Sequence, residues 1–161
     1  MTTPTQRNND NVVVEVWFQI EKDAEGYPKS RDAEGLLCKP LDVECSQCQV
    51  NSIPFYLNSV AYGDTISTSA HPGGYLQFKE VLKRGGYSIY RIFLHDSTNK
   101  ERWITELLDF DVLLEQDGNL IAMAVAPSVD SDALVDYILA GKAKGLWGAQ
   151  DGYILEEPDA S

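Results

Sequence analysis

Residues 87–110 read YSIYRIFLHDSTNKERWITELLDF and carry the clearest secondary-structure signals of the chain. The first part of this stretch, 87–95, is rich in β-branched and aromatic residues, which predicts a strand. Its second part predicts a helix over 98–110, because Thr98 and Glu101 have capping-box spacing and apolar residues recur on one helical face. That face consists of Trp103, Ile104, Leu107 and Leu108.

The rest of this half continues the alternation of strand and helix. Segments 112–115 and 120–126 flank Asp117-Gly118, a strong signal for a hairpin. Residues 131–140 have apolar positions at helical spacing and precede Gly141, which predicts a second helix that stops there. Segment 152–155 is the expected last strand. The order β-α-β-β-α-β predicts a ferredoxin-like unit over 86–157, with both helices on one face of a four-stranded antiparallel sheet.

The first half of the chain predicts only strands. They are expected at 12–20, 36–41, 49–56, 64–69 and 75–82, separated by Asp, Asn, Ser, Pro and Gly. Several short strands in so short a segment predict a small β-barrel-like or bent-sheet unit over 12–85. The expected fold class is therefore α+β, with the two units packed together or merged into one compact domain.

Four short motifs relate the chain to a known family. They are VWF at 16–18, IPF at 53–55, AYGD at 61–64 and GGYS at 85–88. From about Val16 onward the chain resembles a bacterial family of short uncharacterised domains, the domain of unknown function 4265. The resemblance implies no activity.

The IPF and AYGD motifs contain residue types that favour a scaffold role. Pro54 fixes its φ angle and removes a backbone donor, as an edge or a barrel corner requires. Gly63 allows a tight turn, and the carboxylate of Asp64 can accept hydrogen bonds from nearby backbone. The alternative is a site in which Tyr62 and Asp64 line a groove.

The charge of the chain restricts its partners. Thirteen Lys and Arg oppose 25 Asp and Glu, which gives a net charge of -12 over 161 residues. Such a surface repels polyphosphate and attracts basic proteins, so we expect no nucleic-acid partner. No apolar stretch approaches the roughly 18 residues of a membrane-spanning helix, and no signal peptide is evident at the N-terminus. We therefore expect a cytoplasmic protein without a membrane partner.

The three cysteines raise the question of a metal site. Cys45 and Cys48 form a CSQC motif, and Cys38 with His71 would complete a zinc-binding set. The chain lacks a second CxxC, and an odd number of cysteines without a signal peptide favours reduced thiols. We predict that the protein binds no metal and no cofactor. The alternative is a metal site formed by Cys38, Cys45, Cys48 and His71.

A small acidic protein without a catalytic set is typical of an immunity protein. We expect it to bind and neutralise a basic bacterial toxin domain, such as a nuclease of a contact-dependent growth inhibition system. The expected partner surface combines carboxylates, which speed association, with an exposed tryptophan, which slows dissociation. Its residues are Asp109, Asp111, Glu115, Asp117, Trp147 and Asp151. The alternative is an enzyme, or a small-ligand or metal-binding protein, with a site in the groove between the two halves. The sequence leaves the oligomeric state open.

Overall fold

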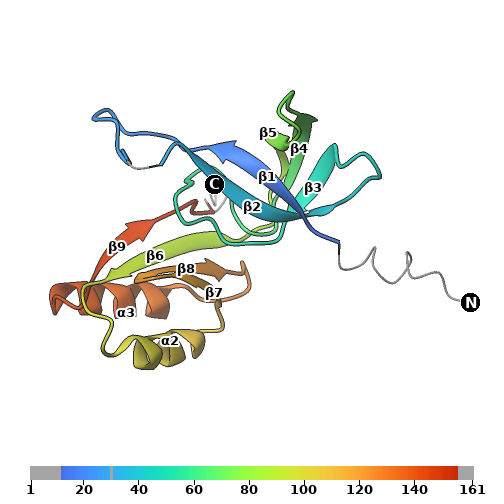
Figure 1. Ribbon diagram of the computed structural model, residues 1–161. Helices are drawn as coiled ribbons and strands as arrows, with labels where there is room; N and C mark the ends of the chain where they lie inside the picture. Colours follow the sequence, from blue (N-terminus) through green and yellow to red (C-terminus); the bar gives the residue numbers. More distant parts are fainter. Residues whose placement is uncertain (1–11, 30, 156–161) are drawn as a thin grey trace, which may run out of the picture. The chain divides into compact units, whose positions relative to one another are not determined.

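The computed structural model describes residues 12–29 and 31–155 (Figure 1). The chain forms two compact units. The first comprises the residues up to Ser52 together with Gly63–Gly85, and the second comprises Ile53–Tyr62 and the residues from Gly86 onward. Segment 53–62, which we had placed in the all-β unit 12–85, therefore belongs to the second unit.

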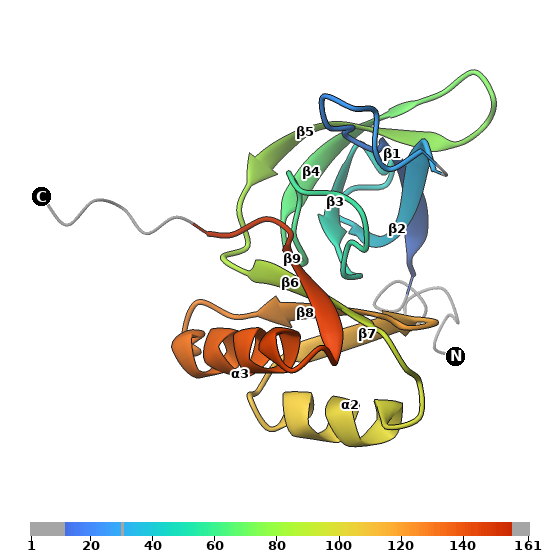
Figure 2. The same ribbon diagram turned by 90° about the vertical axis from the view of Figure 1, so that its left-hand side faces the viewer.

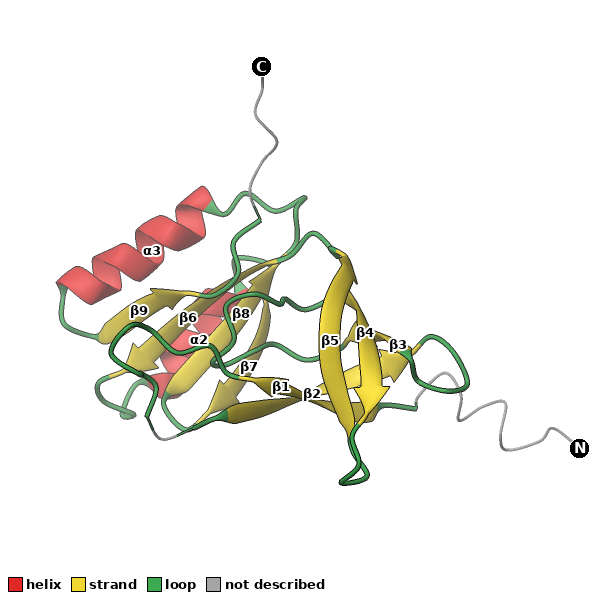
Figure 3. Cartoon of the chain, turned by 90° about the horizontal axis from the view of Figure 1, so that it is seen from above, coloured by secondary structure: helices red, strands yellow, loops and turns green. Residues whose placement is uncertain are grey.

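The first unit is a closed barrel of five strands, drawn in yellow in Figure 3. Its strands are β1 (Val14–Gln19), β2 (Ala33–Pro40), β3 (Gln47–Val50), β4 (Thr65–Ala70) and β5 (Leu76–Lys83). Successive strands are antiparallel, and β1 closes the barrel by pairing parallel with β5, where Val16 lies opposite Leu76. Alternate side chains such as those of Val16 and Phe18 are buried, as expected for strands with one solvated face.

The second unit contains a four-stranded antiparallel sheet in the order β7-β8-β6-β9. Its strands are β6 (Ser88–Leu94), β7 (Leu113–Asp117), β8 (Leu120–Val125) and β9 (Trp147–Asp151). Helices α2 (Lys100–Leu108) and α3 (Asp132–Ala143) lie on one face of this sheet (Figure 2). Ile92, Leu107, Ile138 and Trp147 pack in the core between the sheet and the helices.

Segment 53–62 covers residues on the opposite face of the sheet. Ile53 and Ala61 pack against Ile89, Ala122 and Ala124. The two alanines of β8 have small side chains, which allows the irregular segment to approach the sheet closely.

A buried arginine fastens the same segment to β6. Arg91 is 1% exposed, and its guanidinium donates to the backbone oxygens of Pro54 and Leu57 and to Asn58 Oδ1. The guanidinium presents five N–H donors in a fixed planar arrangement, so one side chain satisfies several acceptors of a segment that has no regular secondary structure.

The predicted α+β class with a ferredoxin-like second unit is wrong. Within 12–29 and 31–155 the structure is mostly β, with nine strands and only two helices, of 9 and 12 residues. Residues 86–157 alone do not make the second unit either, because Ile53–Tyr62 from the first half belongs to it. Neither helix in the described residues is long and apolar enough to cross a membrane.

Two predicted strands have different limits in the structure. The third strand of the barrel ends at Val50, because segment 53–62 leaves the barrel for the second unit. The last strand is β9 (Trp147–Asp151), not 152–155. Gly and Ala in β9 have low strand propensity, but the buried ring of Trp147 anchors this strand to the core, and packing outweighs propensity.

The predicted ends of both helices also change. Asn99 is the N-cap of α2 and makes no side-chain cap, while Thr98 donates instead to Asp96. Gly141 lies inside α3, and a Cβ there would stand 1.9 Å from Cζ2 of Trp147. Gly141 is therefore a packing residue and not a helix stop.

Candidate functional site

The predicted partner residues do not form one patch. Asp109 caps the C-terminal end of α2, and Asp111 follows it in a left-handed conformation with φ of 59°. Asp117 ends β7 and Asp151 ends β9, and these strands are the two opposite edges of the sheet. Exposed carboxylates therefore point to at least two separate surfaces of the second unit.

Two members of the predicted set face inward. Glu115 accepts the backbone N–H of Ile53 at 2.8 Å, so its carboxylate holds segment 53–62. Trp147 is 1% exposed, and its Nε1 donates to the carbonyl oxygen of Ile138 at 2.9 Å. The prediction that Trp147 is an exposed contact is wrong, since its ring fills the core and packs edge-on against Trp103.

Asp109 and Asp111 follow α2 and flank Phe110 in the chain. The ring of Phe110, between them in the chain, packs against Tyr137 with 5.3 Å between centroids. Asp136 is the exposed neighbour of Tyr137 on α3. We call these three exposed carboxylates, Asp109, Asp111 and Asp136, which lie on the two segments joined by the ring contact, the α2–α3 acidic surface. The sequence does not indicate Asp136 as part of this surface, because tertiary contacts of Tyr137 bring its helix to α2.

Hydrogen bonding joins the two helices at this point. The hydroxyl of Tyr137 donates to Glu106 at 2.7 Å. Burial and this bond to a carboxylate raise the pKa of Tyr137 above its usual range, so the hydroxyl keeps its proton. Glu106 also lies 3.6 Å from the guanidinium of Arg102, so it is engaged within the unit and we leave it out of the acidic surface.

The acidic surface has no basic residue near it in the sequence. Residues 103–141 contain eight Asp and Glu and no Lys, Arg or His. The eight are Glu106, Asp109, Asp111, Glu115, Asp117, Asp130, Asp132 and Asp136. Exposed carboxylates of one sign that lie together in space produce a local negative potential that a mixed surface of the same net charge lacks. This absence of Lys and Arg is the signal that could have identified the surface from the sequence.

The cysteines do not assemble a metal site with His71. Cys38 and Cys48 are buried on the neighbouring strands β2 and β3 of the barrel, whereas Cys45 is half-buried in the loop between them. His71 stacks on Tyr75, and its Nδ1 accepts the backbone N–H of Gly73 at 2.9 Å. Among the described residues, no three His, Cys, Asp or Glu side chains are grouped so that they could hold a metal ion.

The two buried thiols are held in the protonated form. Burial, with a smaller contribution from the charge of the neighbouring Cys48, raises the pKa of Cys38 from 9.0 to about 12. Burial likewise raises the pKa of Cys48 to about 11. Since the thiolate is both the nucleophile and the metal ligand, these two groups are poorly suited to either role at neutral pH.

The AYGD motif has a structural role in each unit. Asp64 is fully buried in the first unit, where its carboxylate pairs with Arg84 at 2.8 Å and accepts the N–H of Gly85 at 2.9 Å. A Cβ at Gly85 would lie 2.4 Å from the carbonyl oxygen of Gly63, so glycine is required there. Tyr62, in the second unit, packs edge-on against Tyr87. Asp64 is therefore a scaffold residue and does not line an open groove.

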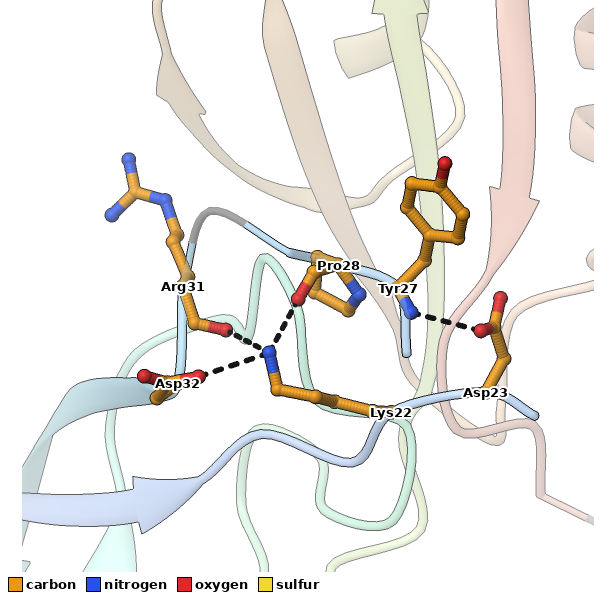
Figure 4. A network of polar contacts seen from close by, with 6 residues as sticks. All are labelled: Lys22, Asp23, Tyr27, Pro28, Arg31 and Asp32. Atoms are coloured by element: carbon orange, nitrogen blue, oxygen red, sulfur yellow. Dashed lines mark hydrogen bonds and ion pairs between the residues drawn. The ribbon is translucent and has the colours of Figure 1, made fainter. Parts of the chain in front are cut away.

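The connection between β1 and β2 is also organised by internal contacts (Figure 4). Lys22 Nζ donates to the carbonyl oxygens of Pro28 at 2.6 Å and Arg31 at 3.1 Å, and it pairs with Asp32 at 2.9 Å. Asp23 accepts the N–H of Tyr27 at 2.9 Å. These charged groups bond within the loop, which accounts for them without a ligand.

Comparisons with known proteins place the chain in a family. A crystal structure of a hypothetical protein from Neisseria gonorrhoeae is similar, with a TM-score of 0.70 at 13% identity over 91% of this chain and 98% of that one. At this identity the similarity shows a shared fold alone. No curated protein matches the chain. The model of the family described as Domain of unknown function (DUF4265) matches residues 34–149, and the chain therefore belongs to that family.

Proposed function

We propose that this protein is a cytoplasmic binding protein that captures a basic protein domain, in the way an immunity protein captures a basic toxin. The observation that supports this proposal is the α2–α3 acidic surface, which lies within a run of residues that contains no Lys or Arg. Its members are exposed, and neither Asp109 nor Asp111 is committed to an ion pair that would neutralise it among the described contacts.

These carboxylates act mainly on the rate of capture. An exposed ion pair contributes only about 0–1 kcal/mol, so three of them do not account for a tight complex. A field of one sign, in contrast, raises association from about 10⁶ toward 10⁸ M⁻¹s⁻¹ at low salt. Leu108, which is 48% exposed next to Asp109, takes the place of Trp147 as the apolar contact that slows dissociation.

The test uses the basic domain encoded by the reading frame next to this one, since toxin and immunity genes are expected side by side. The purified domain and this protein should elute together as a stoichiometric complex. Replacing Asp109, Asp111 and Asp136 by Lys should slow association by at least roughly tenfold at low salt and flatten its salt dependence. Leu108→Ala should instead hasten dissociation.

The matched control reverses charge elsewhere on the same unit. Replacing Asp117 and Asp151 by Lys changes the net charge in the same direction, but these two residues lie at the two edges of the sheet. This control should retain most of the association rate. If it slows association as much as the triple variant, the α2–α3 acidic surface is not the contact. If the neighbouring domain forms no complex with the wild-type protein, the immunity function is wrong.

A further inference from the structure

Within the described residues of the second unit, strand β9 forms one edge of the sheet and has no strand paired on its outer side. It pairs with β6 on one side and is the last strand in the order β7-β8-β6-β9. Leu146 and Gly152, which flank it, both bond to β6: Leu146 O accepts from His95 N at 3.0 Å, and Gly152 N donates to Ile89 O at 2.8 Å. Backbone groups alternate in direction along an antiparallel ladder, so those of Ala149 and Asp151 point away from β6, toward the open edge.

This edge lacks the devices that normally prevent strand pairing. Proteins protect edges with Lys, Pro, bulges or inward-pointing charge. The opposite edge strand, β7, carries Glu115 and Asp117 on one face. Strand β9 has the sequence WGAQD, with no Lys or Pro and a single charge at its end. It is also firmly held, because Trp147 anchors it to the core.

Helix α3 presents a self-complementary ridge beside this strand. Val135, Leu139 and Lys142 line a groove of about 220 Å³ together with Ala149 and Asp151. Asp132, three residues before Val135, lies on the same side of the helix. The ridge therefore reads Asp, Val, Leu, Lys at 132, 135, 139 and 142. Leu139 is 53% exposed, so it contributes apolar surface to the ridge.

A two-fold axis would make every part of this surface match itself. If two copies of α3 run antiparallel, Asp132 of each faces Lys142 of the other, and Val135 faces Leu139. The ridge from 132 to 142 is about 15 Å long at 1.5 Å per residue. The five residues of strand β9 span about 13 Å, which is similar to the length of the ridge. One axis through the middle of both elements therefore pairs β9 with β9 and α3 with α3.

We propose that the second unit associates with a second copy of this chain through the β9 edge and the α3 ridge. The charge complementarity of Asp132 and Lys142, repeated twice by symmetry, favours the second copy over an unrelated partner. Each chain carries a net charge of -12, but at physiological salt the Debye length is about 8 Å, so distant charges oppose the contact only weakly.

Analytical ultracentrifugation of the full chain from about 1 to about 200 μM tests the proposal. The wild-type protein should be a dimer at the upper concentrations. Lys142→Asp places Asp132 against a second acid and should raise the dimer dissociation constant by roughly tenfold or more, and Asp132→Lys should do the same. The double variant restores opposite charges and should restore dimerisation. Lys144→Asp, at the end of the same helix but not on the ridge, is the matched control and should dimerise like the wild type.

Amide hydrogen exchange gives a second measurement that does not depend on the variants. The N–H groups of Ala149 and Asp151 should become protected as the wild-type concentration rises. A wild-type monomer at about 200 μM overturns the proposal. A dimer that the double variant fails to rescue, or in which these two amides stay unprotected, overturns it as well, since another face would then form the contact.

Discussion

Arg91 joins the sheet of the second unit to segment 53–62. Its buried guanidinium bonds to Pro54, Leu57 and Asn58, three residues of an irregular segment. A buried charged donor of this kind is costly to remove, because its acceptors then remain in the protein interior without partners. We therefore expect Arg91→Met to lower the free energy of unfolding by about 3–5 kcal/mol in urea titrations.

Asn58→Ala is the matched control for this prediction, since it removes one acceptor and leaves the guanidinium with its backbone partners. It should cost about 1 kcal/mol. If Arg91→Met costs no more than Asn58→Ala, Arg91 does not hold the segment in place.

The thiols predict a defined order of reaction and a defined dependence on pH. At pH 8 iodoacetamide should modify half-buried Cys45 well before Cys38 and Cys48, whose pKa values burial raises to about 12 and about 11. A peptide map of the partly alkylated native protein measures this order. Modification of Cys38 as fast as Cys45 would show that the barrel opens readily.

The same pKa values predict a loss of stability in alkali. Above pH 9 the thiols of the unfolded chain ionise, while Cys38 and Cys48 in the folded protein keep their protons up to about pH 11–12. The unfolded state then binds fewer protons, so its formation is favoured and the free energy of unfolding falls as pH rises through this window. The free energy of unfolding of Cys38→Ala, measured by chemical denaturation, should fall less steeply over the same pH range than that of the wild type.

The packing of α3 against β9 depends on the contact between Gly141 and Trp147. An added Cβ at Gly141 would meet the indole at 1.9 Å, so Gly141→Ala must displace the ring although alanine favours helix. We expect a net loss of about 1–3 kcal/mol and a changed tryptophan fluorescence. Gly148 follows Trp147 in the chain, and an added Cβ there would meet no atom within 4 Å. Gly148→Ala should therefore change the free energy of unfolding by less than about 0.5 kcal/mol. Equal effects of the two substitutions would contradict this packing.

Local signals predicted most of the individual strands and helices. The hairpin at Asp117-Gly118 is confirmed, although Asp117 pairs with Leu120 and the turn is formed by Gly118 and Asn119. Hydrophobic alternation also located β1 and β6 within one or two residues. These features depend on neighbours in the chain, which is why sequence periodicity detects them.

Features that depend on distant residues were not predicted. The apolar residues of segment 53–62, such as Pro54 and Leu57, follow neither a helical nor a strand period. Nothing in the segment therefore indicates that it packs on a sheet formed by residues after 86. Trp147 follows a helix and a glycine, so its surroundings suggested an exposed loop, whereas tertiary packing places its ring in the core. The acidic surface likewise depends on the contact of Phe110 with Tyr137, which joins two helices far apart in the sequence.

The proposed function rests on the charge of the protein. The net charge of -12 includes a stretch, 103–141, that has no basic residue at all. Solubility alone requires only that the net charge differs from zero, and interspersed charges of both signs meet that requirement. Exposed carboxylates that have no Lys or Arg near them in the sequence are better suited to attracting a basic partner.

Growth of cells that produce the basic domain expected to be encoded beside this gene, with and without this protein, tests directly whether the protein neutralises that domain. We predict that the wild-type protein restores growth, and that the variant with Asp109, Asp111 and Asp136 replaced by Lys does not, at equal abundance of folded protein. Failure of the wild-type protein to restore growth, or equal protection by the variant, would contradict the claim that this surface captures a toxin.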